Sequence, residues 1–442
     1  MKKNTWISVV ATLVVVLGLS FLCSKFLLPL LEFKTYSETF CLTDQITDEM
    51  DVYDIAKLYR DSNSTVAVTV VGHNTELNAE QMSLGSGVVI ASKGYETTSL
   101  SENIVASMGS YIVTNYHVIE NYFDDAFTRI QISIIIEDES EYSCELLWAN
   151  KNLDVAVLYC DDLNADYIRM ADRWVNCDTN VRLDYEEVFT IGTPLQIDYL
   201  NRLTFGNIAS NNNYVFSTST TIYPTRINGV LSYNKYSGIA GVTVLDNVYE
   251  DVIDIAVGIT NGNSGGGLFD SNGVLVGLTT LGANVESTGG NQMNGAVPIY
   301  PVIEVLDKLI ANNELGRNYR IYDLDELGIV GFDSLEASQI TTVGNYSYYY
   351  FDEELYDASN YSDDFNFISS GYYILQNSSS YSALSALSQG SVITSCQITG
   401  EESVEVVDRN DLLYFLLQID DGDQVTFNYT LDGMSQSALV QF

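Results

Sequence analysis

Short strand-like runs separated by turns fill the chain from about residue 61 to residue 316. Ile130, Ile132, Ile134 and Ile136 occupy every second position, which is the spacing of a half-buried strand. A helix is predicted only after Pro301, a residue that suits a first helical turn. Many short strands without long helices between them predict antiparallel barrels or a sandwich. The other strand-like runs are residues 64–71, 85–90, 112–114, 145–148, 155–159, 187–191, 203–209, 264–269 and 274–280.

The amino terminus predicts a membrane anchor. Lys2 and Lys3 precede the uncharged, mostly apolar stretch Asn4–Ser24, which is long enough to cross a bilayer. The lysines favour an amino terminus inside and the remainder of the chain outside. A cleaved signal peptide ending near Gly18–Ser20 is the alternative, and both interpretations export the rest of the chain. We expect a transmembrane anchor over residues 1–28, followed by a stalk with a short helix over residues 29–60.

A second unit is expected after the main β domain of residues 61–316. Residues 317–442 mix strands near 372–375, 391–395 and 424–429 with short helices near 381–388 and 409–418. Residues 318–442 carry 20 acidic and 2 basic side chains, a net charge of −18. Within this unit, Tyr346–Tyr361 is biased toward tyrosine. We interpret it as a solvated loop with aromatic anchors, and a dedicated binding patch is the alternative.

Charge and composition exclude several classes of partner. The chain has 19 Lys and Arg against 59 Asp and Glu, a formal net charge of −40, so its surface repels phosphate backbones and nucleic acid is not expected as a partner. Two histidines and six scattered cysteines without a Cys-x-x-Cys pair argue against a zinc site, and neither a metal nor another cofactor is expected. Cys144 and Cys160 flank a predicted hairpin and either pair or remain as free thiols.

Three short motifs carry reactive side chains in the order His, Asp, Ser. Thr114-Asn115-Tyr116-His117-Val118 follows a strand, and Asp154 opens the buried strand of Asn152–Leu158. Gly262-Asn263-Ser264-Gly265-Gly266 is a glycine-rich loop that holds one serine. Each motif alone is common, but the three together in proper strand contexts point to a catalytic set.

A serine hydroxyl is a weak nucleophile at neutral pH and needs a base within hydrogen-bond reach. His117 suits that role because the pKa of histidine lies near working pH, and the Asp154 carboxylate can hold one tautomer of the ring. The glycines around Ser264 let the backbone turn so that amide groups converge on a developing oxyanion. We expect the amides of Gly262 and Ser264 to form this oxyanion hole.

With these motifs in hand, the sequence resembles the HtrA/Deg family of trypsin-like serine proteases. The matching stretches also include Gly85–Ile90, Ile191–Pro194, Phe205–Ser210, Gly273–Thr280 and Gly295–Ile299. The resemblance implies a mainly β fold, a chymotrypsin/trypsin-like double β-barrel with the active site between the barrels. It casts His117 as general base, Asp154 as its orienting partner and Ser264 as nucleophile.

Three positions depart from the family pattern. Ala256 stands where an acidic residue is common before the serine, and Asn261 and Gly267 replace prolines. These changes leave His117, Asp154 and Ser264 in place and affect the expected shape of the substrate pocket and the rigidity of its loops.

The carboxyl-terminal unit resembles a PDZ-like α+β domain more loosely. The similar stretches are Glu326–Ile329, Gly371–Ile374 and Ser385–Ile393, with Ser391 in place of the usual aspartate. In that family a peptide adds as a strand and its terminal carboxylate meets backbone amides. The resemblance places those amides at Leu327, Gly328 and Ile329. A small β-rich domain used only for assembly is the alternative.

These features together predict a single-pass protein of the cell membrane whose protease and PDZ-like domains are extracytoplasmic. The expected activity is ATP-independent serine endopeptidase cleavage of unfolded or damaged proteins, in protein quality control and the stress response. One alternative is a site-specific regulatory protease gated by peptide C-termini at the PDZ-like domain. Another is a non-proteolytic chaperone or adaptor that keeps the fold. The family resemblance also suggests a homotrimer.

Overall fold

The structure is a computed structural model. It describes residues 40–92, 109–171, 186–194, 200–222, 224–227, 230–233, 242–283, 293–333, 341–343, 346–351, 354–357, 370–388, 390–431 and 433–442. The predicted membrane anchor, residues 1–28, lies outside these ranges. No helix within the described part of the chain is long and apolar enough to span a bilayer.

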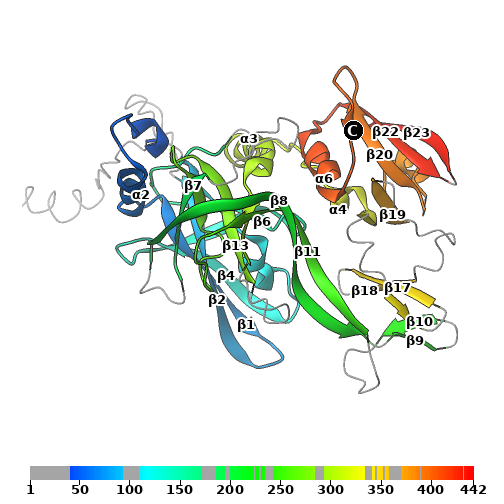
Figure 1. The fold of residues 1–442 in the computed structure, drawn as a ribbon, viewed down its shortest axis with the longest axis horizontal. Helices are drawn as coiled ribbons and strands as arrows, with labels where there is room; N and C mark the ends of the chain where they lie inside the picture. The colour runs from blue at the N-terminus through cyan, green and yellow to red at the C-terminus, as the bar shows by residue number, and fades with distance from the viewer. Residues whose placement is uncertain are drawn as a thin grey trace, which may run out of the picture. The chain divides into compact units, whose positions relative to one another are not determined.

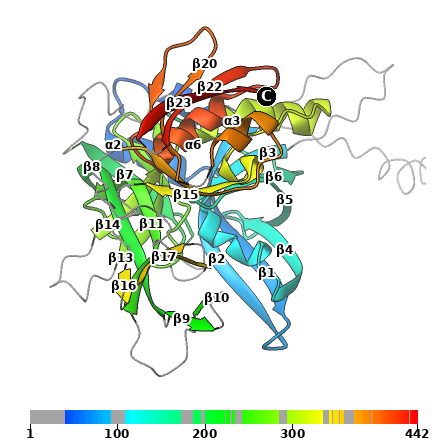
Figure 2. The same cartoon turned by 90° about the vertical axis from the view of Figure 1, so that its right-hand side faces the viewer.

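Two closed barrels of six antiparallel strands form the core of the structure, and their strands can be followed in Figures 1 and 2. The strand order of the first barrel is β1-β2-β3-β6-β5-β4. Its interior is filled by every second residue of these strands, among them Val66, Val68 and Val70. The bounds are β1 Thr65–Asn74, β2 Ala79–Ser92, β3 Gly109–Thr114, β4 Phe127–Ile135, β5 Glu141–Asn150 and β6 Val155–Asp161.

The second barrel has the order β11-β14-β13-β12-β7-β8. Val188, Ile255 and Leu268 belong to its interior cluster. Strands β8 and β11 are long and pair with several irregularities in register, and a separate two-stranded sheet joins β9 and β10. The bounds are β7 Glu187–Gly192, β8 Arg202–Ile222, β9 Pro224–Ile227, β10 Val230–Tyr233, β11 Val242–Ile255, β12 Gly267–Asp270, β13 Leu275–Ala283 and β14 Met293–Pro298.

The seam between the barrels explains why β3 and most of β6 are buried on both faces. Ala156 and Leu158 point into the first barrel, whereas Val155 and Val157 belong to the cluster that contains Phe189 and other second-barrel residues. The double barrel predicted from the sequence is therefore present.

Helix α2 (Val52–Arg60) packs against the second barrel. Asp51 caps its first turn, accepting from the amides of Tyr53 and Asp54. Tyr59 is fully buried against Phe189 and Phe269, and its hydroxyl donates to the carbonyl of Gly273 at 2.7 Å. The short 3₁₀ helix η2 (Leu42–Gln45) precedes it. The expected short helix is present, and residues 40–60 belong to the body of the peptidase region rather than to a free-standing stalk.

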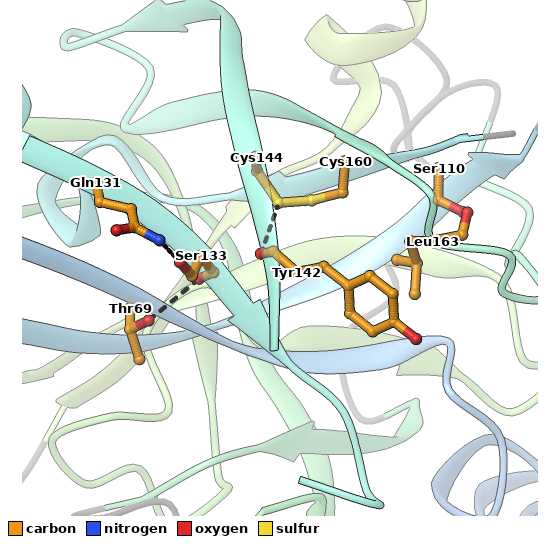
Figure 3. The surroundings of a disulfide bond; sticks show 8 residues. All are labelled: Thr69, Ser110, Gln131, Ser133, Tyr142, Cys144, Cys160 and Leu163. Carbon is orange, nitrogen blue, oxygen red and sulfur yellow. Dashed lines mark hydrogen bonds between the residues drawn. A yellow bond between two sulfur atoms is a disulfide. The ribbon is translucent and has the colours of Figure 1, made fainter. Parts of the chain in front are cut away.

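A disulfide bond joins Cys144 of β5 to Cys160 of β6, with their Cα atoms 4.2 Å apart (Figure 3). The two strands are direct neighbours in the first barrel and form the predicted hairpin. Of the two alternatives that the sequence left open, a disulfide or two free thiols, the structure contains the disulfide. Cys41 and the buried Cys396 are free thiols.

The carboxyl-terminal domain is a curled sheet with the order β15-β19-β20-β22-β23, and β21 pairs with β20. Helix α6 has the predicted bounds, Arg409–Gln418, and a capping box at Asp408. The helix expected near 381–388 is the 3₁₀ helix η8, Ser382–Ala386. The remaining bounds are α4 Leu324–Leu327, β15 Ile329–Asp333, β19 Tyr372–Asn377, β20 Val392–Ile398, β21 Val404–Glu405, β22 Gln424–Leu431 and β23 Met434–Gln441.

Helix α3 (Tyr300–Leu315) has Pro301 in its first turn, as predicted, and contacts α6. Lys308 donates to the carbonyls of Leu417 (3.1 Å) and Ile419 (2.7 Å) and forms an ion pair with Asp420 at 3.0 Å. Because the last carbonyls of a helix lack partners within it, this lysine caps the carboxyl end of α6. The ring of Tyr300 also meets that of Tyr414 at 4.7 Å.

Two sequence interpretations need correction. The part of Tyr346–Tyr361 that the structure describes is not a loop, because β17 (Tyr346–Phe351) pairs with β16 (Thr341–Val343) and β18 (Glu354–Asp357). Tyrosine and phenylalanine favour strands, and this preference outweighed the surrounding acidic residues. The second concerns His73: because it follows the strand-like run of residues 64–71 and precedes Asn74-Thr75, the sequence predicts a surface-loop residue, but it lies within β1 opposite Glu80.

Candidate active site

His117 lies on the 3₁₀ helix η3 (Tyr116–Val118), directly after the buried strand β3. The residues before it are fixed by side-chain bonds: Thr114 Oγ1 donates to the carbonyl of Ser86 at 2.7 Å, and Asn115 Nδ2 donates to the carbonyl of Asp154 at 2.8 Å. A second 3₁₀ helix, η4 (Glu120–Tyr122), follows. The imidazole is 31% exposed, so it is anchored at one edge and accessible at another.

Asp154 stands immediately before β6 and is 1% exposed. Its backbone has a φ of 51°, in the left-handed region that aspartate tolerates better than most residues. The carboxylate accepts from the backbone amide of His117 at 3.0 Å, while His117 Nδ1 lies 2.9 Å from Oδ2. Thr280 Oγ1 also donates to Oδ2, at 2.5 Å. Three hydrogen bonds therefore hold a buried carboxylate against one edge of the imidazole.

Burial lowers the pKa of His117, but the charge and hydrogen bond of Asp154 raise it by more, and Glu120 adds to the rise. The net direction is upward from the ordinary value because the imidazolium is stabilised by its carboxylate partner. Burial in turn raises the pKa of the Glu120 carboxyl. The pair of His117 and Asp154 thus has the geometry and electrostatics of a base held in one orientation.

Ser264 lies in a loop shaped by glycines with positive φ, 93° at Gly262 and 82° at Gly265. A side chain at Gly265 would collide with the carbonyl of Ser86 and with Thr114 Oγ1. The amide of Gly265 donates to the carbonyl of Thr279 at 2.8 Å. The motif is glycine-rich because the loop passes directly against β2 and the histidine segment.

Ser86 of β2 joins this loop to the first barrel. Its amide donates to the carbonyl of Ser264 at 2.7 Å, and its hydroxyl donates to the carbonyl of Gly262 at 2.8 Å. The same hydroxyl accepts from the amide of Thr193 at 2.8 Å. At the neighbouring Gly85, a Cβ would come within 2.6 Å of Val118 and 3.0 Å of the Ser264 carbonyl. Strand β2 therefore brings the histidine and serine segments together.

The hydroxyl of Ser264 donates to the carbonyl of Thr280 at 3.2 Å. Within the described residues it makes no hydrogen bond to His117, so the pair of His117 and Asp154 is joined while the serine is bonded to a different neighbour. The amides of Gly262 and Ser264, expected to form an oxyanion hole, make no backbone hydrogen bond within the same described ranges. Rotation about the Cα–Cβ bond of Ser264 changes the direction of its hydroxyl without moving this backbone.

Sequence reasoning assigned no role to Ser86 or Thr280, although both stand in stretches that carry the family resemblance. Neither residue has a local signal, because each acts on a segment that is distant in the chain: Thr280 and Asp154 are 126 residues apart, and Ser86 and Gly262 are 176 apart. Of the departures, Gly267 has a packing reason, since a Cβ there would collide with the ring of Phe269.

In the carboxyl-terminal domain, Leu327 ends α4, Gly328 follows with a φ of 65°, and Ile329 begins β15. Strand β15 is an edge of the described sheet, as an added peptide strand requires. The amide of Leu327 donates to the carbonyl of Asp323 at 3.0 Å and that of Gly328 to the carbonyl of Asp325 at 2.9 Å. Two of the three amides expected to meet a carboxylate are thus already bonded within α4.

Among the described residues, no group of three or more His, Cys, Asp and Glu side chains is placed to hold a metal ion. The chemistry of the site is that of an imidazole, a carboxylate and a hydroxyl.

The double barrel with this pair at its seam defines the class as trypsin-like serine peptidases. Residues 85–278 match the family model of the trypsin-like peptidase domain. The chain is 22% identical over 295 residues to a Serine protease Do-like HtrA of Lactococcus lactis subsp. lactis, covering 64% of each chain. It is 26% identical over 225 residues to a Probable periplasmic serine endoprotease DegP-like of Pseudomonas putida, covering 51% of this chain and 37% of that one. Residues 85–278 are thus a trypsin-like peptidase domain, and the chain is similar to serine proteases of the HtrA/DegP type.

Each match covers less than two thirds of the relative's own length. Among solved structures, the HtrA-type protease AlgW with tripeptide is similar over 88% of this chain and 96% of that chain, with a TM-score of 0.46 and 18% identity.

Proposed function

We propose that the chain is an HtrA-type serine endopeptidase in which Ser264 is the nucleophile, His117 the general base and Asp154 the residue that orients the base. The proposal depends on the hydrogen bond between His117 Nδ1 and Asp154 Oδ2, at 2.9 Å. Strand β2 holds the loop of Ser264 beside this pair, because Ser86 of β2 bonds both that loop and the segment before His117. Because Nδ1 of His117 is bonded to the carboxylate of Asp154, Nε2 of the same ring can receive a proton.

In the proposed reaction, Ser264 Oγ turns from Thr280, attacks the scissile carbonyl carbon, and transfers its proton to Nε2 of His117. The tetrahedral oxyanion is stabilised by the amides of Gly262 and Ser264. The C–N bond then breaks, and Nε2 returns the proton to the leaving amine, which gives an acyl-enzyme. A water molecule attacks the acyl carbon with His117 again accepting the proton, and the acid product leaves as Ser264 regains its hydrogen.

The proposed setting is extracytoplasmic. Residues 1–28 would form a single membrane anchor, residues 40–316 the peptidase domain, and residues 317–442 a PDZ-like domain that receives peptide C-termini. The name of the Pseudomonas relative, a periplasmic endoprotease, supports this location. The proposed substrates are unfolded or damaged proteins, cleaved without ATP, and the proposed assembly is a homotrimer.

The test uses a fluorophosphonate probe and casein. Wild type should label and cleave, whereas Ser264→Ala should do neither while unfolding at the same temperature. Ser385→Ala changes an exposed serine of the carboxyl-terminal domain and serves as the matched control. Unchanged labelling of Ser264→Ala would refute the assignment of the nucleophile, and a wild type that never labels would favour a chaperone or adaptor.

A regulatory protease is the second candidate, and the edge strand β15 favours it because an incoming peptide can pair there. Added C-terminal peptides should then raise casein cleavage severalfold. Cleavage that does not respond to peptides of varied sequence favours the quality-control function.

A further inference from the structure

The turn that presents Asp154 is held from two sides by one buried side chain. Asn150, 5% exposed, ends β5 and pairs across the hairpin with Val155. Its Oδ1 accepts from the backbone amide of Leu153 at 3.0 Å, which closes the turn from within. Asn150 also faces Asp323, a residue of the segment that follows the peptidase domain: burial raises the pKa of the Asp323 carboxyl, and hydrogen bonding from the Asn150 side chain lowers it in part.

Asp323 is itself fixed. Its Oδ1 accepts from the backbone amide of Glu326 at 2.8 Å and so caps the start of α4. Leu324 and Leu327 of α4 are buried in the cluster that also contains Leu153 of the turn. The partner of Asn150 is therefore a capping residue on a helix whose apolar side packs in the same core as the turn.

Asp154 needs such support because of its backbone. A non-glycine residue with a φ of 51° costs free energy and persists where its surroundings determine it. The hydrogen bond to His117 Nδ1 also depends on the carboxylate standing at a fixed position. A turn that relaxed would move the carboxylate away from the ring.

We propose that Asn150 is a positioning residue for the reaction: by bonding both the turn that ends at Asp154 and the side chain of Asp323, it keeps the Asp154 carboxylate aligned with His117. The inference rests on the proposed function, because it presumes that Asp154 orients the base. The carboxyl-terminal segment then contributes to the arrangement of the active site through Asp323.

The test exchanges the two partners. Asn150→Asp keeps the acceptor for Leu153 but places a carboxylate against Asp323. Asp323→Asn keeps the acceptor for Glu326 but places an amide against Asn150. Each single change loses one hydrogen bond, so kcat should fall about fivefold with KM nearly constant. The double variant restores a donor facing an acceptor and should recover the wild-type kcat. Asn152→Asp and Glu326→Gln make the same charge changes nearby and serve as matched controls.

A second readout follows the imidazole directly and does not require turnover. The chain has two histidines, so the proton signal of His117 can be assigned with His73→Gln and titrated by NMR. Asp154 and Glu120 are the carboxylates that raise the pKa of His117. Misplacement of Asp154 lowers that pKa in both single variants. A bare charge effect would raise it in Asn150→Asp and lower it in Asp323→Asn.

Equal downward shifts in the single variants, reversed in the double variant, support the inference. Wild-type titration and kcat in both single variants overturn it, even where Ser264-dependent cleavage is intact. Shifts of the His117 pKa in opposite directions in the two single variants also overturn the inference, because they would follow from the changed charges alone. Loss of Ser264 labelling in the wild type would refute the proposed function instead, and the titration would still decide whether Asn150 positions Asp154.

Discussion

The first barrel supplies an imidazole and a carboxylate that already touch, whereas the second barrel supplies a hydroxyl that is bonded elsewhere. His117 and Asp154 are connected by their side chains and by the backbone amide of His117. Ser264 reaches the carbonyl of Thr280, within its own barrel. One barrel thus supplies both the imidazole and the carboxylate, and Thr280 of the second barrel adds one hydrogen bond to that carboxylate. Bringing the Ser264 hydroxyl to the imidazole requires a side-chain rotation at the seam.

The two barrels also differ in how their hairpins are secured. A disulfide joins neighbouring strands β5 and β6 of the first barrel. The second barrel depends on apolar packing, including the stack of Phe189 on Phe269 at 5.0 Å. We therefore expect substitutions in the first barrel to disturb the position of His117. Substitutions at the seam between the barrels should instead disturb the contact between His117 and Ser264.

The largest effect is expected from Asp154→Asn. An amide at this position donates to Nδ1 and favours the wrong tautomer of His117, so kcat should fall by about 10⁴. Peptide hydrolysis measures the loss, and circular dichroism checks that the barrel is intact. A variant that keeps a tenth of the wild-type kcat would show that the preassembled pair is not the base.

The disulfide comes next. Replacing Cys144 and Cys160 by serine removes a bridge between residues 16 apart, and we expect a loss of about 3 kcal/mol in the free energy of unfolding. Denaturant titration measures it. Cys41→Ser, at a free thiol, is the control and should change stability far less. Equal free energies of unfolding with and without the bridge would show that the disulfide does not stabilise the first barrel.

Thr280 tests the seam itself. Thr280→Val removes the hydroxyl that donates to Asp154 but keeps the backbone carbonyl that accepts from Ser264. One net hydrogen bond is lost, so kcat should fall about fivefold, whereas Thr280→Ser should stay near wild type. Equal losses in both variants would assign the effect to packing instead of the hydroxyl.

The smallest effect is a shift in the pH profile. Asp154 raises the pKa of His117, so kcat/KM should rise with pH through a midpoint above 6.5. The charged pair stabilises the fold fully below that ordinary value, and this stability is lost as pH rises through the raised pKa. Glu120→Gln should lower the midpoint slightly. A midpoint at or below 6.5 would mean that burial of His117 outweighs its carboxylate partner.

Local patterns predicted much of this molecule. The alternating isoleucines of β4, the bounds of α6 and the proline of α3 were visible because each depends on neighbours within one element. The candidate residues His117, Asp154 and Ser264 were visible for the same reason, since each stands in a short motif.

Contacts between distant segments were not predictable. Ser86, Thr280 and the bond from Asn150 to Asp323 depend on how the folded segments meet. The strands of the tyrosine-rich segment were missed because its acidic residues suggested a solvated loop. The amides of Leu327 and Gly328 are hydrogen-bonded within α4. This helix has four residues and is too short to show a helical period in the sequence, so these bonds were not predicted.

The bonds of Lys308 to the end of α6 have a consequence for the effect of salt on this contact. Mobile ions weaken attraction between exposed charges, with a screening length of about 8 Å at physiological ionic strength and about 3 Å at 1 M. Asp420, 68% exposed, is open to that screening, but Lys308 is only 12% exposed and also holds two backbone carbonyls at short range. Added salt that weakens the pair of Lys308 and Asp420 therefore leaves the two bonds to backbone carbonyls in place, and the contact between α3 and α6 should tolerate a rise in ionic strength.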